Sequence, residues 1–520
     1  MLLSLRFWMN SAEMAQLFCN LASMSWIIYF LLFGAMIFLI ARRKFFQLPG
    51  VHRSIPLLFF IIKICASFAV YWVYTSHYPD RKTADIFKYF DDGNVMYSAV
   101  HENSGDYLKM LSGVGDNSIP TEKYYHRMDH WDQQFDNHLL NDAHFMIRIN
   151  AVMRLISVGN YHIHSLLFCF LAFIGLCALF KALVSFVPQW KWTLALIIFL
   201  FPSLLFWTSG VLKESVMILG LGIFLLQLFQ FAEDRKLIRC LWMFLSIVLL
   251  FFTRFYLVAA LIPTSIALLW TRKNSSGILL KYFISIFVFA GLALCIRFIS
   301  PDHDPLKVLA LKQRDFVNVG NGGTRLYNDT IVVFIKGDPG KFVNVQNDSV
   351  YTIKEGTDYM YWYHFPDFSD TVFVTNSHDH AHYKLLNEQI AAGSLIETRI
   401  LEPTLSSFLL ATPSGISHAL FRPYIWEAKD MLTLIPALEN IFLLVFMILS
   451  VVFRKKPENL SATIFFITFS ILLLWLMGIT TPILGALVRY RIAAFPFLLI
   501  ALLMCIDFDR LSSGKRTGDQ

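Results

Sequence analysis

Residues 238–270 read IRCLWMFLSIVLLFFTRFYLVAALIPTSIALLW, and the only charged side chains in this stretch are Arg239 and Arg254. A helix that crosses a bilayer needs roughly 20 mostly apolar residues, because the hydrocarbon core is about 30 Å thick. The stretch provides two apolar windows, one on each side of Arg254. We therefore predict two membrane-spanning helices here, over residues 238–253 and 255–270.

The same pattern recurs along most of the chain. Of its 520 residues, 56% are hydrophobic and only 16% are charged, whereas soluble domains carry about 25% charged residues. This composition excludes an ordinary cytosolic enzyme and predicts an all-α polytopic membrane protein with about eleven transmembrane helices. The predicted spans are 25–41, 55–74, 164–187, 191–207, 211–231, 238–253, 255–270, 278–299, 431–453, 461–478 and 484–507.

The distribution of Lys and Arg predicts how these spans are oriented. Short cytoplasmic loops carry an excess of both residues, and with eleven spans the basic loops all fall on one side. The N-terminus is then outside and the C-terminal tail lies in the cytoplasm. Because the basic residues set topology, the net charge of +7 does not predict a nucleic-acid partner. The basic residues of these loops are Arg42, Arg43, Lys44, Lys181, Lys191, Arg235, Lys236, Arg272, Lys273, Arg454, Lys455, Lys456, Lys515 and Arg516.

Two long polar segments separate three groups of predicted spans, and both fall on the extracytoplasmic side. Apolar residues at mixed helical spacing predict an amphipathic helix near residues 145–156 in the first segment. Turn residues and the run Ile-Val-Val-Phe-Ile at 331–335 predict that the second segment is partly β. The predicted parts are two N-terminal spans (1–74), a first extracytoplasmic loop (75–163), a six-helix transmembrane core (164–299), a second loop domain (300–430), and three C-terminal spans with a short tail (431–520).

Charged residues at the outer ends of spans are informative, because topology does not require them and a charge at the membrane boundary is costly. The first such site is the acidic segment between Asp85 and Gly93, after the second span. On a helix, Asp85 and Asp92 share a face while Asp91 points elsewhere. A carboxylate here suits a general base for an acceptor hydroxyl or a metal ligand. The alternative is a solvated acidic turn that ends at Gly93.

The second site is the pair Lys213 and Glu214, which opens a span after a tight outer hairpin. No other charged residue lies in that span, so the pair needs a partner or a wet cavity. Lys213 can hold an anionic group as a point charge. The alternative is a lysine that extends to the membrane surface, with Glu214 in the first helical turn.

Arginines mark three further sites on the same side. Arg254 lies among aromatic residues, which suits a phosphate contact or an interfacial anchor. Arg489 and Arg491 lie in the last span, where neither can face lipid cheaply. Guanidinium groups bind phosphate oxygens bidentately, and the alternative is an ion pair with Glu439 or Glu427 that ties spans together. The predicted binding site includes Lys213, Glu214, Arg254, Arg422, Glu427, Arg489, Tyr490 and Arg491.

The segment around residue 380 is the one metal-like pattern. His378, His380 and His382 put three imidazoles on one face of an extended chain, which a divalent metal can use. An exposed polar loop explains the same residues.

At these residues the chain resembles the GT-C superfamily of multi-pass glycosyltransferases, which use polyprenyl-phosphate-linked sugars. It looks most like the bacterial branch related to protein mannosyltransferases and lipid A aminoarabinose transferases, and it is also similar to multi-pass membrane proteins of Bacteroidetes. The resemblance covers most of the spans but not the second loop. Here the acidic stretch follows the second span rather than the first, and the family's usual Asp-Glu pair is Asp-Asp. The resemblance rests on the stretch Asp85 to Asp92, the hairpin from Phe201-Pro202-Ser203 to Lys213-Glu214, and Arg489-Tyr490-Arg491 followed by Ala494-Phe495-Pro496.

The resemblance implies a role for each group. Asp91 or Asp92 is the expected catalytic base, with Asp85 behind them, in an inverting displacement at the anomeric carbon. The implied donor is a polyprenyl-phosphate sugar, the acceptor is a glycan, lipid or protein, and the site faces the periplasmic side of the inner membrane. No cofactor is required, and a divalent metal is compatible with the chemistry. The implied contacts of the lipid phosphate are Lys213, Arg254, Arg489 and Arg491.

Two other functions fit parts of the pattern. A polymerase of O-antigen or exopolysaccharide also has many spans, outer loops and arginines, and would need its arginines without an essential aspartate. A transporter or lipid flippase is the third reading, although transporters usually place their charged site near the bilayer midplane, between inverted repeats.

Overall fold

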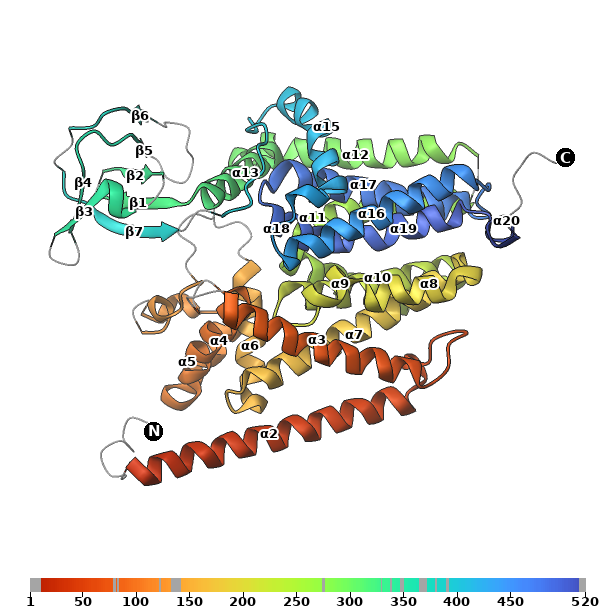
Figure 1. Cartoon of the computed structure of the whole chain (residues 1–520), viewed down its shortest axis with the longest axis horizontal. Coiled ribbons are helices and arrows are strands. Elements are labelled where there is room, and N and C mark those ends of the chain that lie inside the picture. The colour runs from red at the N-terminus through yellow and green to blue at the C-terminus, as the bar shows by residue number, and fades with distance from the viewer. Residues whose placement is uncertain are drawn as a thin grey trace.

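Figure 1 shows the computed structural model of the chain as a bundle of long helices with a helical layer and a β element at one end. The structure describes residues 11–77, 81, 84–120, 123–131, 142–273, 276–328, 330–336, 339–346, 350–363, 372–378, 381–389 and 392–513.

Eight helices in the described part of the chain are long and apolar enough to cross a membrane. A ninth crossing is counted if α18 (Leu484–Tyr490) and α19 (Phe495–Met504), bent by 53°, form one span. The chain is therefore an α-rich, membrane-embedded polytopic protein. The eight helices are α2 (Ser11–Arg42), α3 (Ile55–His77), α7 (Tyr161–Leu183), α10 (Lys213–Asp234), α11 (Leu237–Lys273), α12 (Ile278–Ile299), α16 (Met431–Val452) and α17 (Leu460–Thr480).

With the bent pair counted as one span, the nine crossings are two fewer than the predicted eleven, for two reasons. The predicted span 191–207 is divided into α8 (Lys191–Ala195), a π-helical turn and α9 (Pro202–Trp207), none long enough to cross alone. Phe201 is extended ahead of Pro202, which has no N–H to continue the helix. The two predicted spans on either side of Arg254 form the single element α11.

The backbone of α11 is not helical at Arg254, where φ is −154° and ψ is 79°. Arg254 lies beside Glu214 at the start of α10. At the other end of α11, Thr271 hydrogen-bonds with Ser461 at the start of α17, and the end of α10 reaches the same region through Phe229 and Phe466. The chain therefore turns back at Arg254, and both ends of α11 lie at the end of the bundle where α10 finishes.

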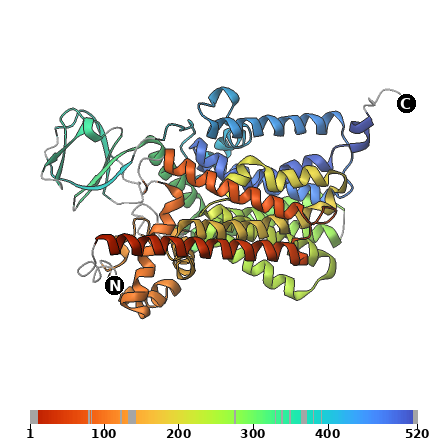
Figure 2. The same cartoon turned by 60° about the horizontal axis from the view of Figure 1, so that its bottom comes forward.

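A helical layer covers the opposite end of the bundle. It consists of α4 (Asp85–Glu102), α5 (Ser104–Ser112) and α6 (Asp142–Ser157), of which α6 is the amphipathic helix expected from the sequence. Gly93 lets α4 and α6 approach closely, because a Cβ there would lie 2.8 Å from the Cβ of Asn150. Figures 1 and 2 show this layer and the strands at the same end, which we call the loop end. We call the other end of the bundle, where α10 ends, the basic end.

The segment predicted to be partly β contains two small antiparallel sheets, reached through α13 (Pro305–Asn321). A five-stranded sheet has the order β6-β5-β2-β1-β7, and a two-stranded sheet pairs β3 with β4. The predicted run 331–335 corresponds to β2. The strands are β1 (Gly323–Tyr327), β2 (Val332–Ile335), β3 (Val343–Gln346), β4 (Val350–Ile353), β5 (Tyr359–Trp362), β6 (Val372–Val374) and β7 (Lys384–Gln389), with the short helix α14 (Pro339–Phe342) before β3.

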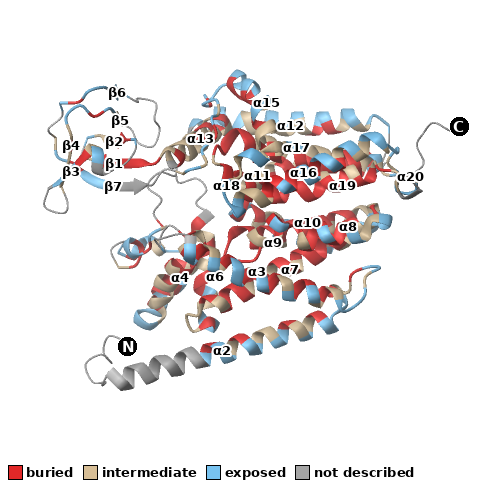
Figure 3. Cartoon of the chain, in the orientation of Figure 1, coloured by how far each residue is buried: buried red, intermediate tan, exposed pale blue. Residues whose placement is uncertain are grey.

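The helix α15 (Leu405–Phe421) lies within the predicted second loop and was not predicted from the sequence. It packs closely on α17, since a Cβ at Gly478 would come within 2.0 Å of the carbonyl oxygen of Gly415. Small residues allow such close helix contacts in membranes. Figure 3 shows the centre of the bundle as mostly buried and α12 as mostly exposed. The large apolar side chains that α12 exposes suit a surface in contact with lipid. The chain's described part ends with α20 (Phe508–Ser513).

Candidate charged site

Glu214 lies at the centre of a buried ionic network at the loop end. It is the second residue of α10 and is 1% exposed. One carboxylate oxygen accepts from Arg254 at 2.5 Å, and the other accepts from Arg489 at 2.7 Å. Because the chain turns at Arg254 and α18 approaches from the C-terminal spans, three distant segments of sequence meet at this one carboxylate.

Asp85 extends the network to the surface. Arg489 uses one terminal nitrogen for Glu214 and the other for Asp85, at 2.7 Å. The second oxygen of Asp85 accepts from Lys88, one helical turn later, at 2.8 Å. The side chain of Asp85 is 37% exposed and that of Arg489 is 10% exposed, so the network runs from solvent into the protein.

Aromatic rings surround the cations of the network. The guanidinium carbon of Arg254 lies 4.2 Å from the ring centre of Tyr490, and that of Arg489 lies 5.3 Å from Trp207. The ammonium of Lys213 lies 5.0 Å from the ring centre of Tyr89. Such cation–π contacts stabilise positive charges that have left water.

Six ionisable side chains make up the charged site. Arg254, Arg489, Lys88 and Lys213 carry four positive charges, and Asp85 and Glu214 carry two negative charges. Cationic side chains gathered at one place attract anionic groups.

The ionisation of Asp85 follows from these neighbours. Burial alone raises the pKa of the Asp85 carboxyl, but the nearby charges of Lys88 and Arg489 outweigh burial and hold the pKa well below its usual range. The charge of Asp85 in turn raises the pKa of the Lys88 ammonium. Both groups are therefore ionised at neutral pH.

Asp91 and Asp92, the expected base candidates, lie outside this network. Asp91 is paired with Arg81 through two hydrogen bonds of 2.8 Å and is 41% exposed. Asp92 is buried, and its two oxygens accept from the backbone N–H groups of Asp129 and His130 at 3.0 and 2.9 Å. Asp92 thus holds the 129–130 segment against α4.

Arg422, Glu427 and Arg491 form a separate group of contacts. Arg422 donates to Glu427 at 2.5 Å, and the other oxygen of Glu427 accepts from the Tyr424 N–H at 2.8 Å. Arg491 is 1% exposed and donates to the backbone oxygens of Arg422 and Pro436 at 2.6 and 3.3 Å. These contacts connect the segment after α15 with α16 and the last spans.

Glu439, which the sequence offered as a partner for the arginines, bonds elsewhere. Its carboxylate accepts from the backbone N–H and the hydroxyl of Ser203, both at 2.6 Å. The contact joins α16 to the first turn of α9.

Two lysines at or near the charged site were not predicted from the sequence. Lys88 lies in the acidic segment and was passed over in favour of its aspartates. Lys63 lies in α3 and is 1% exposed. It donates to the hydroxyls of Thr208 and Ser209 at 2.7 and 3.2 Å. These two residues lie shortly before Lys213 and Glu214 in the sequence. A lone lysine inside an apolar window was the signal that could have found it.

The histidine pattern is only partly described. His378 and His382 are exposed, and His380 lies outside the described residues. Within the described part of the chain, no three His, Cys, Asp or Glu side chains are arranged to hold a metal ion.

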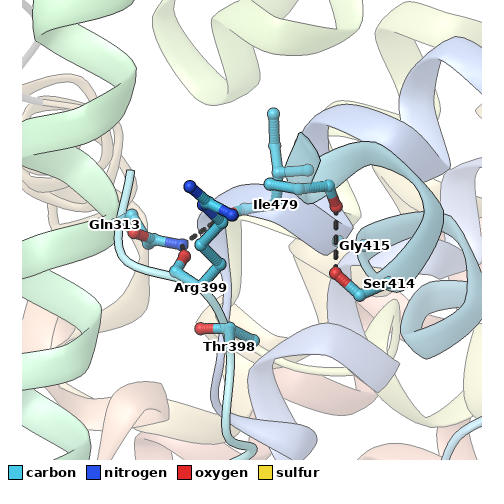
Figure 4. Close-up of a pocket in the computed structure, with 8 residues that line it drawn as sticks. Gln313, Thr398, Arg399, Ser414, Gly415 and Ile479 are labelled. Atoms are coloured by element: carbon cyan, nitrogen blue, oxygen red, sulfur yellow. Dashed lines mark hydrogen bonds between the residues drawn. The ribbon is translucent and has the colours of Figure 1, made fainter. Parts of the chain in front are cut away.

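A small recess lies between α13, α15 and α17 (Figure 4). Gln313 crosses its wall and donates to the backbone oxygens of Arg399 and Ile479 at 2.9 and 2.8 Å, while accepting from the Leu401 N–H at 2.7 Å. Gln313 is saturated by these bonds, so its role is to join the three segments.

Comparison with known proteins does not assign a family to this arrangement. No protein-family model, curated protein or solved structure matches the chain.

Proposed function

We propose that this protein is a membrane glycosyltransferase that moves a sugar from a polyprenyl-phosphate donor to an acceptor at the loop end. The observation that carries the proposal is the charged site of Asp85, Lys88, Lys213, Glu214, Arg254 and Arg489. It combines a solvent-accessible carboxylate with four cationic side chains beside the membrane-spanning helices. A lipid phosphate and a hydroxyl nucleophile need these two kinds of group.

The chemistry assigns a role to each side of the site. The acceptor oxygen attacks the anomeric carbon, the bond from that carbon to the phosphate oxygen breaks, and the polyprenyl phosphate leaves. Asp85 takes the acceptor's proton as the general base. Lys88, Lys213, Arg254 and Arg489 stabilise the phosphate, whose negative charge increases as the bond breaks. The proposal assigns neither role to Asp91, Asp92 or Arg491, because their contacts lie elsewhere.

The topology we propose has eleven crossings, with α11 counted as two and the 191–207 segment as one broken span. The turn of α11 at Arg254 and the position of the charged site opposite the basic end support this arrangement. Loops rich in Lys and Arg then face the cytoplasm. The charged site faces the periplasmic side of the inner membrane, where polyprenyl-linked sugars meet lipid, glycan or protein acceptors.

A polymerase that uses a polyprenyl pyrophosphate donor is the second candidate. The specific observation in its favour is that the most buried ionic contacts pair Glu214 with two arginines, while Asp85 is more exposed. A transporter is less well supported, because Glu214 and Lys213 begin α10 rather than lying halfway along it.

The test compares glycans in cells that lack the native gene and express single variants at matched membrane levels. Asp85→Asn should abolish the glycan product and Asp91→Asn should preserve it. The transferase mechanism fails if Asp85→Asn cells keep the wild-type glycan. If Arg254→Gln and Arg489→Gln alone lose it, and the lost product consists of long chains, the polymerase is favoured.

A further inference from the structure

The two carboxylates of the charged site differ in how firmly they are held. Glu214 is 1% exposed and contacts two arginines from different spans. Asp85 is 37% exposed and begins α4, which lies outside the spans. Removing Asp85 from Arg489 would leave that arginine still anchored on Glu214. Asp85 is therefore the replaceable anion of the pair.

The cations that hold Asp85 would remain in place for another anion. Lys88 and Arg489 contact different oxygens of the carboxylate, at 2.8 and 2.7 Å. The Arg489 Nε is buried and has no hydrogen-bond partner among the described residues. The guanidinium group thus has a donor beyond those that Asp85 and Glu214 use. This donor lies on the edge of the guanidinium group that faces Glu214, so a phosphate in the place of Asp85 bonds to the other terminal nitrogen and to Lys88.

We propose that Asp85 occupies the place of a phosphate group between Lys88 and Arg489, and that a bound phosphate displaces it. The displaced carboxylate then lies beside the bound anion, free of the two cations. The first part of this inference stands on the contacts alone. The second part, that the freed carboxylate accepts the proton of an acceptor hydroxyl, rests on the proposed function.

The exchange explains how one residue can be both an ion-pair partner and a base. A carboxylate held by two cations is a weak base, because its protonated form is disfavoured. When a phosphodiester takes over the cations, one negative charge replaces another and Asp85 regains basicity. The site would then contain an active base only when a donor is bound.

The chain provides a matched control on the same helix. Asp91 is also paired with an arginine, Arg81, and is exposed to a similar degree, 41%. Lys88 and Arg489 contact Asp85 instead, and Asp91 has no contact with either among the described residues. A change at Asp91 removes a comparable ion pair without removing the anion from the Lys88–Arg489 pair.

The experiment measures ligand affinity of the purified full-length protein in lipid nanodiscs. The probes are a short-chain polyprenyl phosphate, inorganic phosphate, and the matching polyprenol as the uncharged control. Asp85→Asn should bind the phosphate probe roughly 3-fold to 30-fold more tightly than wild type, because a competing anion is removed. Lys88→Gln should weaken binding by a similar factor, and Asp91→Asn should not change it.

The outcomes separate the inference from the proposed function. Unchanged or weaker binding by Asp85→Asn, with Lys88→Gln also unchanged, overturns the inference even if Asp85→Asn cells lose their glycan. Tighter binding by Asp85→Asn in cells with normal glycans supports the exchange and removes the transferase role. If Asp85→Asn binds only the polyprenyl phosphate more tightly than wild type does, the anion is a lipid headgroup. If it binds inorganic phosphate more tightly by the same factor, the anion is a soluble phosphate. Tightening for the polyprenol contradicts the inference.

Discussion

Arg489 and Arg491 lie two residues apart in the last spans and are both buried, but they contact different kinds of acceptor. Arg489 donates to the carboxylates of Asp85 and Glu214. Arg491 donates to the backbone oxygens of Arg422 and Pro436. Carbonyl oxygens accept hydrogen bonds from a guanidinium group without neutralising its charge. Carboxylates accept these hydrogen bonds and also neutralise the charge.

The difference separates a charged site from a structural brace. At Arg489, removing a carboxylate changes the electrostatic potential and exposes a cation to a ligand. At Arg491, the guanidinium group holds the turn before α16 against the last spans, and its ring contact is with Phe495 at 4.5 Å. The following predictions test whether the two regions differ in this way.

The largest expected effect is at Glu214. Replacing Glu214 by Ala leaves Arg254 and Arg489 buried beside each other without their shared carboxylate. Breaking a buried ion pair by removing one partner costs about 3–5 kcal/mol, so we expect low membrane yield and a strongly lowered Tm in detergent. The comparison variant is Glu427→Gln, whose partner Arg422 is 25% exposed. If both variants unfold equally, burial of the network is not what stabilises it.

A smaller loss is expected at the brace. Arg491→Met removes the guanidinium donor that bonds to two backbone oxygens, which costs about 1–3 kcal/mol and lowers the Tm. Arg489→Lys keeps the positive charge, but one ammonium cannot reproduce the planar fork that joins Asp85 to Glu214. We therefore expect Arg489→Lys to weaken phosphate binding more than Arg491→Met does, measured per folded molecule. The reverse order would move the anion site to Arg491.

The variant Asp92→Asn tests whether this residue of the acidic segment stabilises the fold. Asp92→Asn retains one side-chain oxygen for two backbone N–H groups, so we expect a loss of about 1–2 kcal/mol, read as a lower Tm. Glycan synthesis per folded molecule should persist. Loss of the glycan at an unchanged Tm would return the base role to Asp92.

Asp91 has a smaller expected effect on stability. Its pair with Arg81 is largely exposed, and such pairs contribute at most about 1 kcal/mol. The Tm of Asp91→Asn should therefore be nearly that of wild type in low salt and equal to that of wild type in high salt. A large loss in both conditions would show that the pair anchors α4.

The smallest expected effect is the response of stability to pH between 5 and 8. Lys88 and Arg489 lower the pKa of Asp85 in the folded protein. A lowered folded pKa gives stability that is present above the unfolded pKa, about 3.9, and is lost only as the pH falls through the folded pKa. The Tm difference between wild type and Asp85→Asn should stay constant from pH 5 to 8 and shrink in strong acid. A change centred near neutral pH would contradict this ionisation state.

The fold was predicted to the extent that periodicity and composition determine it. Long apolar runs predicted the spanning helices, and α6 and β2 were anticipated from local patterns. The broken span at Pro202 and the helix α15 were not, because their outcome depends on packing against other helices. The positions of the basic loops are compatible with a turn of the chain at Arg254. No local pattern in the sequence gives the direction that α11 takes after this residue.

For the charged site, the sequence alone identified ionisable residues that cannot face lipid without a large cost, because the cost of placing a charge in hydrocarbon is local and can be read from a short window of sequence. It thereby determined that Lys213, Glu214, Arg254 and Arg489 need partners. Which partner each one has was decided only by the tertiary structure. Glu214 meets Arg489 across 275 residues and Asp85 meets it across 404, and electrostatic pairing over such separations depends on how the spans pack.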